Sequence, residues 1–186
     1  MQSIHEKYNK VVVPELKKQF GRGNDFEVPK IEKVVVNVGI GKFLNDSALV
    51  ADVLNSVEII TAQKPLKTKS RKSIAGFKIR EGLEVGIKVT LRGKRMWDFL
   101  ERMVGAALPR VKDFHGIKLS AVDTDGNLNI GIKEHMIFPE ILPEQVKNIF
   151  PFQVTVVTSA KDSEEGMALF RALGFPMEVR ETETKR

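Results

Sequence analysis

Cysteine is absent from this chain of 186 residues, which excludes disulfide bonds, thiolate metal sites and a cysteine nucleophile. The three histidines, His5, His115 and His135, are scattered without the spacing of metal ligands. No apolar run approaches the roughly 20 residues that span a bilayer, and the first residues lack the apolar core of a signal peptide. We therefore expect a soluble cytoplasmic protein with no membrane partner, no metal and no cofactor.

Patterns typical of enzymes are also missing. The run Gly39-Ile-Gly41-Lys42 lacks the first glycine of a phosphate loop, because Val36 stands there, and Phe43 replaces the required Ser or Thr. Two nearby acids, Asp123 and Asp125, indicate a turn, since the long loop and terminal Glu of a calcium site are absent. There is no Ser-His-Asp arrangement or carboxylate pair. We therefore predict a protein that is not an enzyme.

The charge is moderately positive and unevenly distributed. Lys and Arg number 30 against 24 Asp and Glu, a formal net charge of +6. Many of the acids are grouped at 162–165 and 178–183, so a local positive face is expected elsewhere. Nucleic acid is accordingly the first partner class to consider.

The basic segment, residues 64–82, is the densest concentration of this charge. Seven of the 17 residues from Lys64 to Arg80 are Lys or Arg, and no acid occurs before Glu81. Such a segment favours an extended, mobile loop that a polyanion would bind, releasing its own counterions. The alternative is an ordinary solvated surface loop.

Hydrophobic periodicity predicts an α+β fold. Helical spacing occurs at 3–20, from 45–47 to about Gln63, at 94–108 and from Asp162 onward, whereas alternation indicates strands at 31–40, 83–92, 127–133 and 152–159. We expect a mostly antiparallel sheet of about five strands with helices on one face and an open polar, basic face for RNA. Residues 1–186 are expected to form one domain that ends in a polar tail, 178–186.

Three of the predicted strands carry unusual residues on the side away from the core. Small, polar and cationic residues alternate there with apolar ones: Asn37 and Gly39; Gly86, Lys88, Thr90 and Arg92; Asn127, Asn129, Gly131 and Lys133. If the strands are neighbours, they form a flat hydrogen-bonding surface that a ligand can approach closely. A plain solvated sheet face is the alternative. Aromatics for stacking bases are missing apart from Phe77, so structured RNA is the favoured target.

Five short motifs carry a resemblance to a known family. They read VNVGIG at 36–41, TAQKP at 61–65, KSIAGFKIREG at 72–82, KVTLRG at 88–93 and IFPEI at 137–141. In this order they closely resemble large-subunit ribosomal protein five of bacteria, the 5S-rRNA-binding ribosomal protein family. The resemblance covers nearly the whole chain and implies a ribosomal protein of the cytoplasm.

The resemblance also implies partners. Members of that family bind 5S rRNA and help to attach it to 23S rRNA in the central protuberance, beside other 5S-associated proteins. They also contact the P-site tRNA, and small-subunit protein thirteen in an intersubunit bridge.

Site residues follow from matching motifs and from the predicted outward faces. The family's 5S contact matches Asn37, Gln63 and Thr90, to which we add Gly39, Lys88, Arg92, Lys64, Lys67 and Lys69. The tRNA contact matches Ser73, Ala75, Gly76, Phe77, Lys78 and Arg80. The bridge has two candidate surfaces, 109–116 and the loop 134–143, and the residues chosen from the first are Arg110, Val111, Lys112, Asp113 and His115.

Two other classes of function stay open at this point. One is a free-standing RNA chaperone or regulator that uses the same surface. The other is a small enzyme with a basic substrate pocket. Stoichiometric presence in purified ribosomes separates the ribosomal protein from the chaperone, and turnover of a substrate would reveal the enzyme.

Overall fold

The computed structural model describes residues 3–43, 46–142, 144, 146 and 148–178. Apart from Glu178, the predicted polar tail lies outside these residues. The main elements are α1 (Ile4–Lys7), α2 (Val13–Gln19), η2 (Asp25–Glu27), β1 (Ile31–Gly39), α3 (Ser47–Thr61), β2 (Leu66–Lys69), η4 (Ala75–Phe77), β3 (Glu84–Leu91), α4 (Gly93–Arg102), β4 (Leu128–Ile132), β5 (Phe152–Thr158) and α5 (Ser163–Leu173). No helix in the described part is long and apolar enough to cross a membrane.

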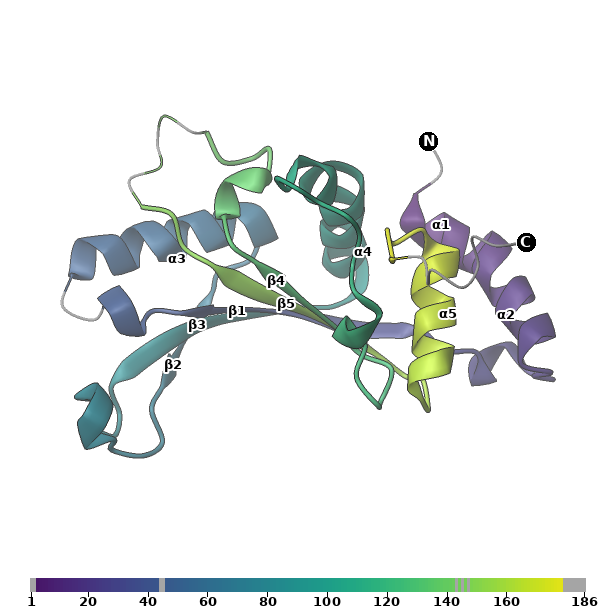
Figure 1. Cartoon of the computed structure of the whole chain (residues 1–186), viewed down its shortest axis with the longest axis horizontal. Coiled ribbons are helices and arrows are strands. Elements are labelled where there is room, and N and C mark those ends of the chain that lie inside the picture. The colour runs from purple at the N-terminus through teal and green to yellow at the C-terminus, as the bar shows by residue number, and fades with distance from the viewer. Residues whose placement is uncertain (1–2, 44–45, 143, 145, 147, 179–186) are drawn as a thin grey trace.

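The five strands form one sheet in the order β2-β3-β1-β5-β4, with every neighbouring pair antiparallel (Figure 1). This confirms the predicted α+β class. Four strands coincide with the predicted segments to within two residues at either end. The fifth, β2, lies inside the basic segment, where a loop was expected, and pairs with β3 at the edge of the sheet.

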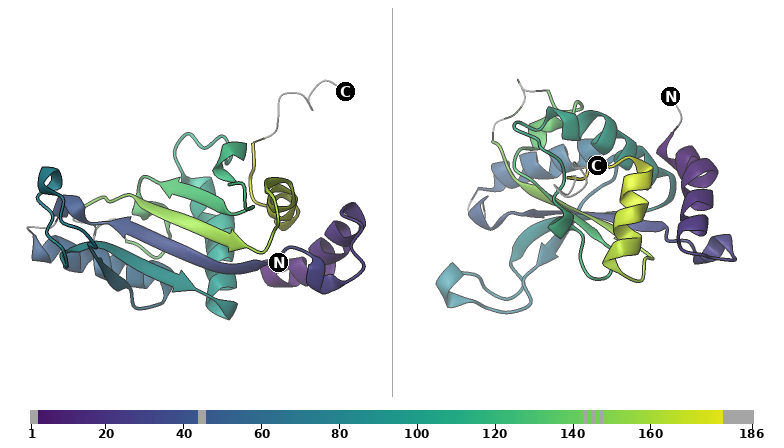
Figure 2. Two further views of the ribbon diagram at one scale, coloured as in Figure 1. Left: turned by 90° about the horizontal axis from the view of Figure 1, so that it is seen from below. Right: turned by 45° about the vertical axis from the view of Figure 1, so that its right-hand side comes forward.

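The core lies between the sheet and a helical layer on one side. Val34, Val36 and Val38 of β1 are at most 1% exposed, whereas Asn37 and Gly39 between and beyond them are exposed. Helices α3 and α4 lie behind the sheet when it is seen from below, and the other face is left open (Figure 2). Helices α1, α2 and α5 gather at one end of the sheet (Figure 1).

The N-terminal helical segment changes geometry before Pro14. A π-helical turn, Tyr8–Val12, joins α1 to α2, and the N–H of Val13 bonds to the carbonyl of Tyr8. Proline has no N–H to donate to the preceding turn, which accounts for the irregularity expected there. The segment ends as predicted at Gly21, whose φ of 62° is left-handed and suits glycine.

Helix α5 packs directly onto the turn that precedes β4. A Cβ built on Gly166 would lie 2.5 Å from the carbonyl oxygen of Gly126, a distance that real Cβ atoms do not reach. Backbone therefore touches backbone at this point, and no side chain fits between them. Gly126 itself has a φ of 73° and closes the turn that Asp123 begins.

We expect Gly166→Ala to lower the free energy of unfolding by about 1–3 kcal/mol, because the added methyl must displace backbone. Helix propensity alone predicts the opposite sign, a gain of up to about 1 kcal/mol. Gly105→Ala is the control, since Gly105 is also helical, in a π-helical turn, and its Cβ would meet nothing within 4 Å. Urea unfolding measures both; a stabilised Gly166→Ala variant would contradict the contact.

A buried histidine lies on the helical side of the core. His135 is 1% exposed and stacks on Phe150 with ring centroids 4.0 Å apart. Burial lowers the pKa of His135, because the charged ring would lose its hydration. A small cavity of about 70 Å³ beside the ring is also lined by Asp52 and Glu140.

The pH dependence of stability follows from this. In the unfolded chain the pKa of His135 returns to its usual value of about 6.5. Between the lowered pKa of the folded state and this value, the unfolded chain binds more protons than the folded one. The stability that neutral His135 confers is therefore complete above the pKa of the unfolded state and is lost as the pH falls below it toward the pKa of the folded state. We expect His135→Phe to lose less stability than the wild type between pH 8 and pH 5 in urea unfolding. Equal losses in both proteins would show that His135 is not held neutral.

Candidate nucleic-acid interface

The strand register places polar side chains in rows across the open face. In one row Lys88, Asn37, Gln153 and Gly131 stand side by side on β3, β1, β5 and β4. In the next row Thr90, Val35, Thr155 and Asn129 do the same. We call these eight residues, together with Gly39, Lys33 and Arg92, the outward face. Eight of its eleven residues have side chains that can form hydrogen bonds, the exceptions being Val35, Gly39 and Gly131. Directly paired side chains on neighbouring strands lie about 5 Å apart.

The helix α3 and the outward face meet at Gln63. The side-chain Nε2 of Gln63 donates a hydrogen bond to the backbone carbonyl of Thr90 at 3.2 Å. Thr90 lies diagonally from Asn37 across the β1–β3 pair, at about 7 Å by the geometry of antiparallel strands. The structure therefore brings Asn37, Gln63 and Thr90 to one place, although they are far apart in the sequence.

The end of α3 is shaped to allow this contact. Ala62 has a φ of 50° and so caps the helix in the left-handed conformation that glycine usually occupies. The hydroxyl of Thr61, 1% exposed, donates to the carbonyls of Val57 and Gln63 at 2.7 and 3.1 Å. These bonds hold the chain as it leaves the helix on its way to β2.

The glycines of the sheet differ from one another. A Cβ on Gly39 or Gly131 would meet nothing within 4 Å, so a ligand can approach the backbone there. A Cβ on Gly86 would lie 2.7 Å from Oγ1 of Thr68. Glycine at position 86 is thus explained by packing against β2, without any ligand.

The structure separates some of the residues that the sequence grouped together. Lys67 pairs with Ile87, whose side chain is buried, so Lys67 lies on the helical side of the sheet, where it forms an ion pair with Glu84 at 2.7 Å. Lys69 follows a shift of register within β2. The sheet thus carries Lys88 on one face and Lys67 on the other.

The remaining two predicted cations lie at the borders of the outward face. Lys64 is exposed and follows Gln63 directly. Arg92 is exposed between β3 and α4, at the N-cap of that helix. Both charges are therefore available to a ligand on the open side.

Beyond β2 the basic segment projects as an arm (Figure 1). Backbone hydrogen bonds join Ser70 to Gly82 and Leu83 at the base of the arm. Farther out, Ser73 Oγ accepts from the N–H of Glu81 at 2.9 Å. An isolated β-bridge pairs Ile74 with Ile79. Residues 71–78 are all exposed, with Phe77 at 73%. The predicted tRNA residues Ser73, Ala75, Gly76, Phe77, Lys78 and Arg80 therefore share one exposed tip.

The predicted bridge residues, Arg110 to His115, lie apart from this arm, in the loop that follows α4. This loop is fastened where the N–H of Ile117 donates to Pro176 O at 2.7 Å. Together with β4 it borders a cavity of about 510 Å³, lined among others by Arg110, Lys112 and Asp113. This cavity meets the outward face only along β4, where Asn129 and Gly131 belong to both.

Sequence reasoning missed the contribution of β5. This strand lies between β1 and β4, so the condition that the three polar strands are neighbours holds for β3 and β1 but not for β4. Thr155 Oγ1 donates to Asn129 Oδ1 at 2.8 Å, and Gln153 Nε2 reaches the same oxygen at 3.5 Å. The alternation of apolar and polar residues along this strand predicted that Gln153 and Thr155 point away from the core, but it did not predict the order of the strands.

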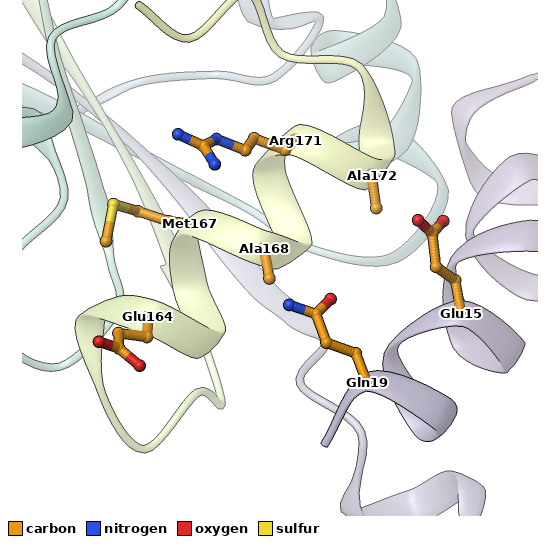
Figure 3. A pocket seen from close by; sticks show the side chains of 7 residues that line it. All are labelled: Glu15, Gln19, Glu164, Met167, Ala168, Arg171 and Ala172. Carbon is orange, nitrogen blue, oxygen red and sulfur yellow. The ribbon is translucent and has the colours of Figure 1, made fainter. Parts of the chain in front are cut away.

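Helices α2 and α5 leave a shallow groove between them, of about 500 Å³. Figure 3 shows Glu15 and Gln19 reaching from α2 toward Ala168 and Ala172, while Met167 and Arg171 point away from α2. Acidic and basic groups do not converge here as they would in an active site. Nor do three or more His, Cys, Asp or Glu side chains meet anywhere in the described residues to hold a metal ion.

These features define a class: an α+β protein with an open, polar and cationic sheet face as its candidate ligand site. Residues 24–80 match the family described as ribosomal protein L5, and residues 84–177 match the model of that ribosomal family's C-terminus. The large ribosomal subunit protein uL5 of Colwellia psychrerythraea is 46% identical over 180 residues, covering 97% of this chain and 99% of that protein.

The chain belongs to the ribosomal protein L5 family. It is therefore a ribosomal protein with a structural rather than an enzymatic role, which confirms the predicted family and the absence of catalysis. The predicted location on cytoplasmic ribosomes agrees with this membership. RNA is accordingly a general partner class of the protein.

We expect Ala62→Gly to raise the free energy of unfolding by up to about 1 kcal/mol. Relief of left-handed strain, about 1–2 kcal/mol, exceeds the extra entropy of an unfolded glycine, about 0.4–1 kcal/mol. Ala51→Gly, at an exposed position inside the same helix, should instead lower it by about 1 kcal/mol. Urea unfolding compares the two, and equal destabilisation would show that the cap at Ala62 is unstrained.

Proposed function

We propose that this protein is a structural constituent of the large ribosomal subunit that binds 5S rRNA through its outward face. The observation that carries the proposal is the meeting of Asn37, Gln63 and Thr90 at the junction of β1, α3 and β3. Amide and hydroxyl groups both donate and accept, so they suit the 2′-hydroxyls and phosphates of structured RNA. Family membership supports RNA as the ligand.

Attachment of 5S rRNA to 23S rRNA in the central protuberance completes this role, with other 5S-associated proteins as neighbours. The exposed cations Lys88, Arg92 and Lys64 surround the junction and attract phosphate. Lys67 and Lys69 belong to the edge strand β2, so they act at longer range or on RNA that wraps this edge.

The arm is proposed to reach the P-site tRNA. Its tip carries Phe77 among the exposed cations Arg71, Lys72, Lys78 and Arg80, and no ion pair within the described residues occupies any of the four. Small-subunit protein thirteen is the proposed partner of residues 110–115, which lie in a loop at a distance from the arm along the chain and in the fold (Figure 1). A free-standing RNA chaperone would use the same face but would be absent from purified ribosomes.

We expect Asn37→Ala or Thr90→Ala to weaken 5S rRNA binding by about 10- to 100-fold, because each leaves a buried RNA group without its partner. Asn55→Ala is the control, since Asn55 is exposed on α3 in the opposite layer. Filter binding at several salt concentrations measures the affinity.

The basic segment should behave differently in the same assay. Neutralising Lys69, Arg71 and Lys72 with Gln should chiefly flatten the salt dependence, by about 0.7–0.9 per lost phosphate contact. The control variant neutralises Lys112, Lys118 and Lys161, which removes the same three charges from another part of the surface. If the arm variant lost 5S recognition while Thr90→Ala kept full affinity, the assignment of the two regions would be reversed.

A further inference from the structure

Phe26 is the most exposed large apolar side chain of the described residues, at 90%. It lies in η2, the single turn between α2 and β1, far from the arm. Burying a phenylalanine side chain stabilises a protein, so the nearly full exposure of Phe26 forgoes that gain. An isolated exposed residue can be incidental, but here the surrounding turn is built to hold it.

The turn around Phe26 is ordered by its own hydrogen bonds. Asn24 Oδ1 accepts from the N–H of Phe26 at 3.1 Å, and the Asn24 carbonyl accepts from Glu27 at 3.2 Å. Asp25 accepts from Lys17 of α2 at 2.6 Å. Phe26 is therefore presented on a fixed support, which reduces the entropy cost of binding.

Both ends of this turn are also anchored. Before it, Arg22 forms an ion pair with Glu165, which is 5% exposed. After it, the carbonyl of Pro29 accepts from the hydroxyl of Tyr8 at 3.3 Å. Lys30 and Ser159 exchange two further hydrogen bonds, at 3.1 and 2.9 Å.

The chemistry around Phe26 favours RNA over an apolar protein partner. Residues 17–30 contain four cations against two acids, Asp25 and Glu27. Lys17 and Arg22 are ion-paired, whereas Lys18 and Lys30 take part in no ion pair within the described residues. Val28 is buried and Phe20 half-buried, so within this stretch Phe26 is the single exposed large apolar side chain. A lone ring among cations suits stacking on a base, whereas protein interfaces bring several apolar side chains together.

The position of Phe26 extends the proposed RNA surface. Lys33 of the outward face follows Phe26 by seven residues, within β1. The exposed ring of Phe77 lies beyond the opposite end of β1, a strand of nine residues that spans roughly 26 Å. The outward face between them lacks aromatic side chains.

We propose that Phe26 stacks on an unpaired base of ribosomal RNA, forming a contact separate from the outward face and from the arm. The base belongs to a loop or bulge, because paired bases do not expose their faces. The proposal rests on the ribosomal identity of the protein but not on 5S rRNA being the RNA concerned.

Photo-crosslinking in assembled large subunits tests the nature of the partner. Benzoylphenylalanine at position 26 should crosslink to ribosomal RNA, and primer extension on 5S and 23S rRNA should stop at one site. The same group at Ile149, which is 53% exposed on another surface, is the matched control. Crosslinks from position 26 to protein alone, or to nothing, would overturn the proposal.

Affinity measurements complete the test. Phe26→Ala should weaken binding to the crosslinked RNA by about 5- to 100-fold, whereas Phe26→Trp should retain it, because both aromatic rings stack. Leu142→Ala, at 55% exposure, should have no effect. Since Phe26 is exposed, thermal unfolding of Phe26→Ala should match the wild type. Unchanged affinity of Phe26→Ala would refute stacking, even if Thr90→Ala abolished 5S rRNA binding. If the protein does not bind 5S rRNA at all, the crosslink and the affinity of position 26 for 23S rRNA still decide the proposal.

Discussion

The antiparallel register of β1 with β3 and β5 is the constraint on which the rest of the structure depends. It sends Val34, Val36 and Val38 into the core and aligns Val35 and Asn37 between them with polar residues of β3 and β5. A slip of one residue would exchange the two faces of β1, exposing valines and burying Asn37. Core packing and ligand recognition are therefore specified by the same pairing, and neither can be altered alone.

A second level of organisation connects the two layers of the fold. The outward face is made by strands, yet one of its proposed recognition residues, Gln63, comes from the end of a helix on the opposite side. It reaches the face because α3 ends in a left-handed residue and because the Thr90 carbonyl receives its side chain. The position of α3 and the geometry of the face are consequently linked through one hydrogen bond.

The sequence predicted those features that depend on local periodicity. Alternation identified β1, β3, β4 and β5 with the correct buried faces, and the motif resemblance identified the family. It did not reveal β2, because the run Leu66–Lys69 is too short and charged to signal a strand, and its pairing partner is distant. Strand order, the opposite orientation of Lys67, and the exposure of Phe26 all depend on long-range packing, which a local pattern does not encode.

The ion pair between Arg22 and Glu165 joins residues 143 positions apart, close to the two ends of the described chain. During synthesis the N-terminal helices emerge first, but their anchor in α5 does not yet exist. The segment that carries Phe26 therefore gains this anchor only after α5 has been made, so an N-terminal turn depends on a helix made much later in synthesis.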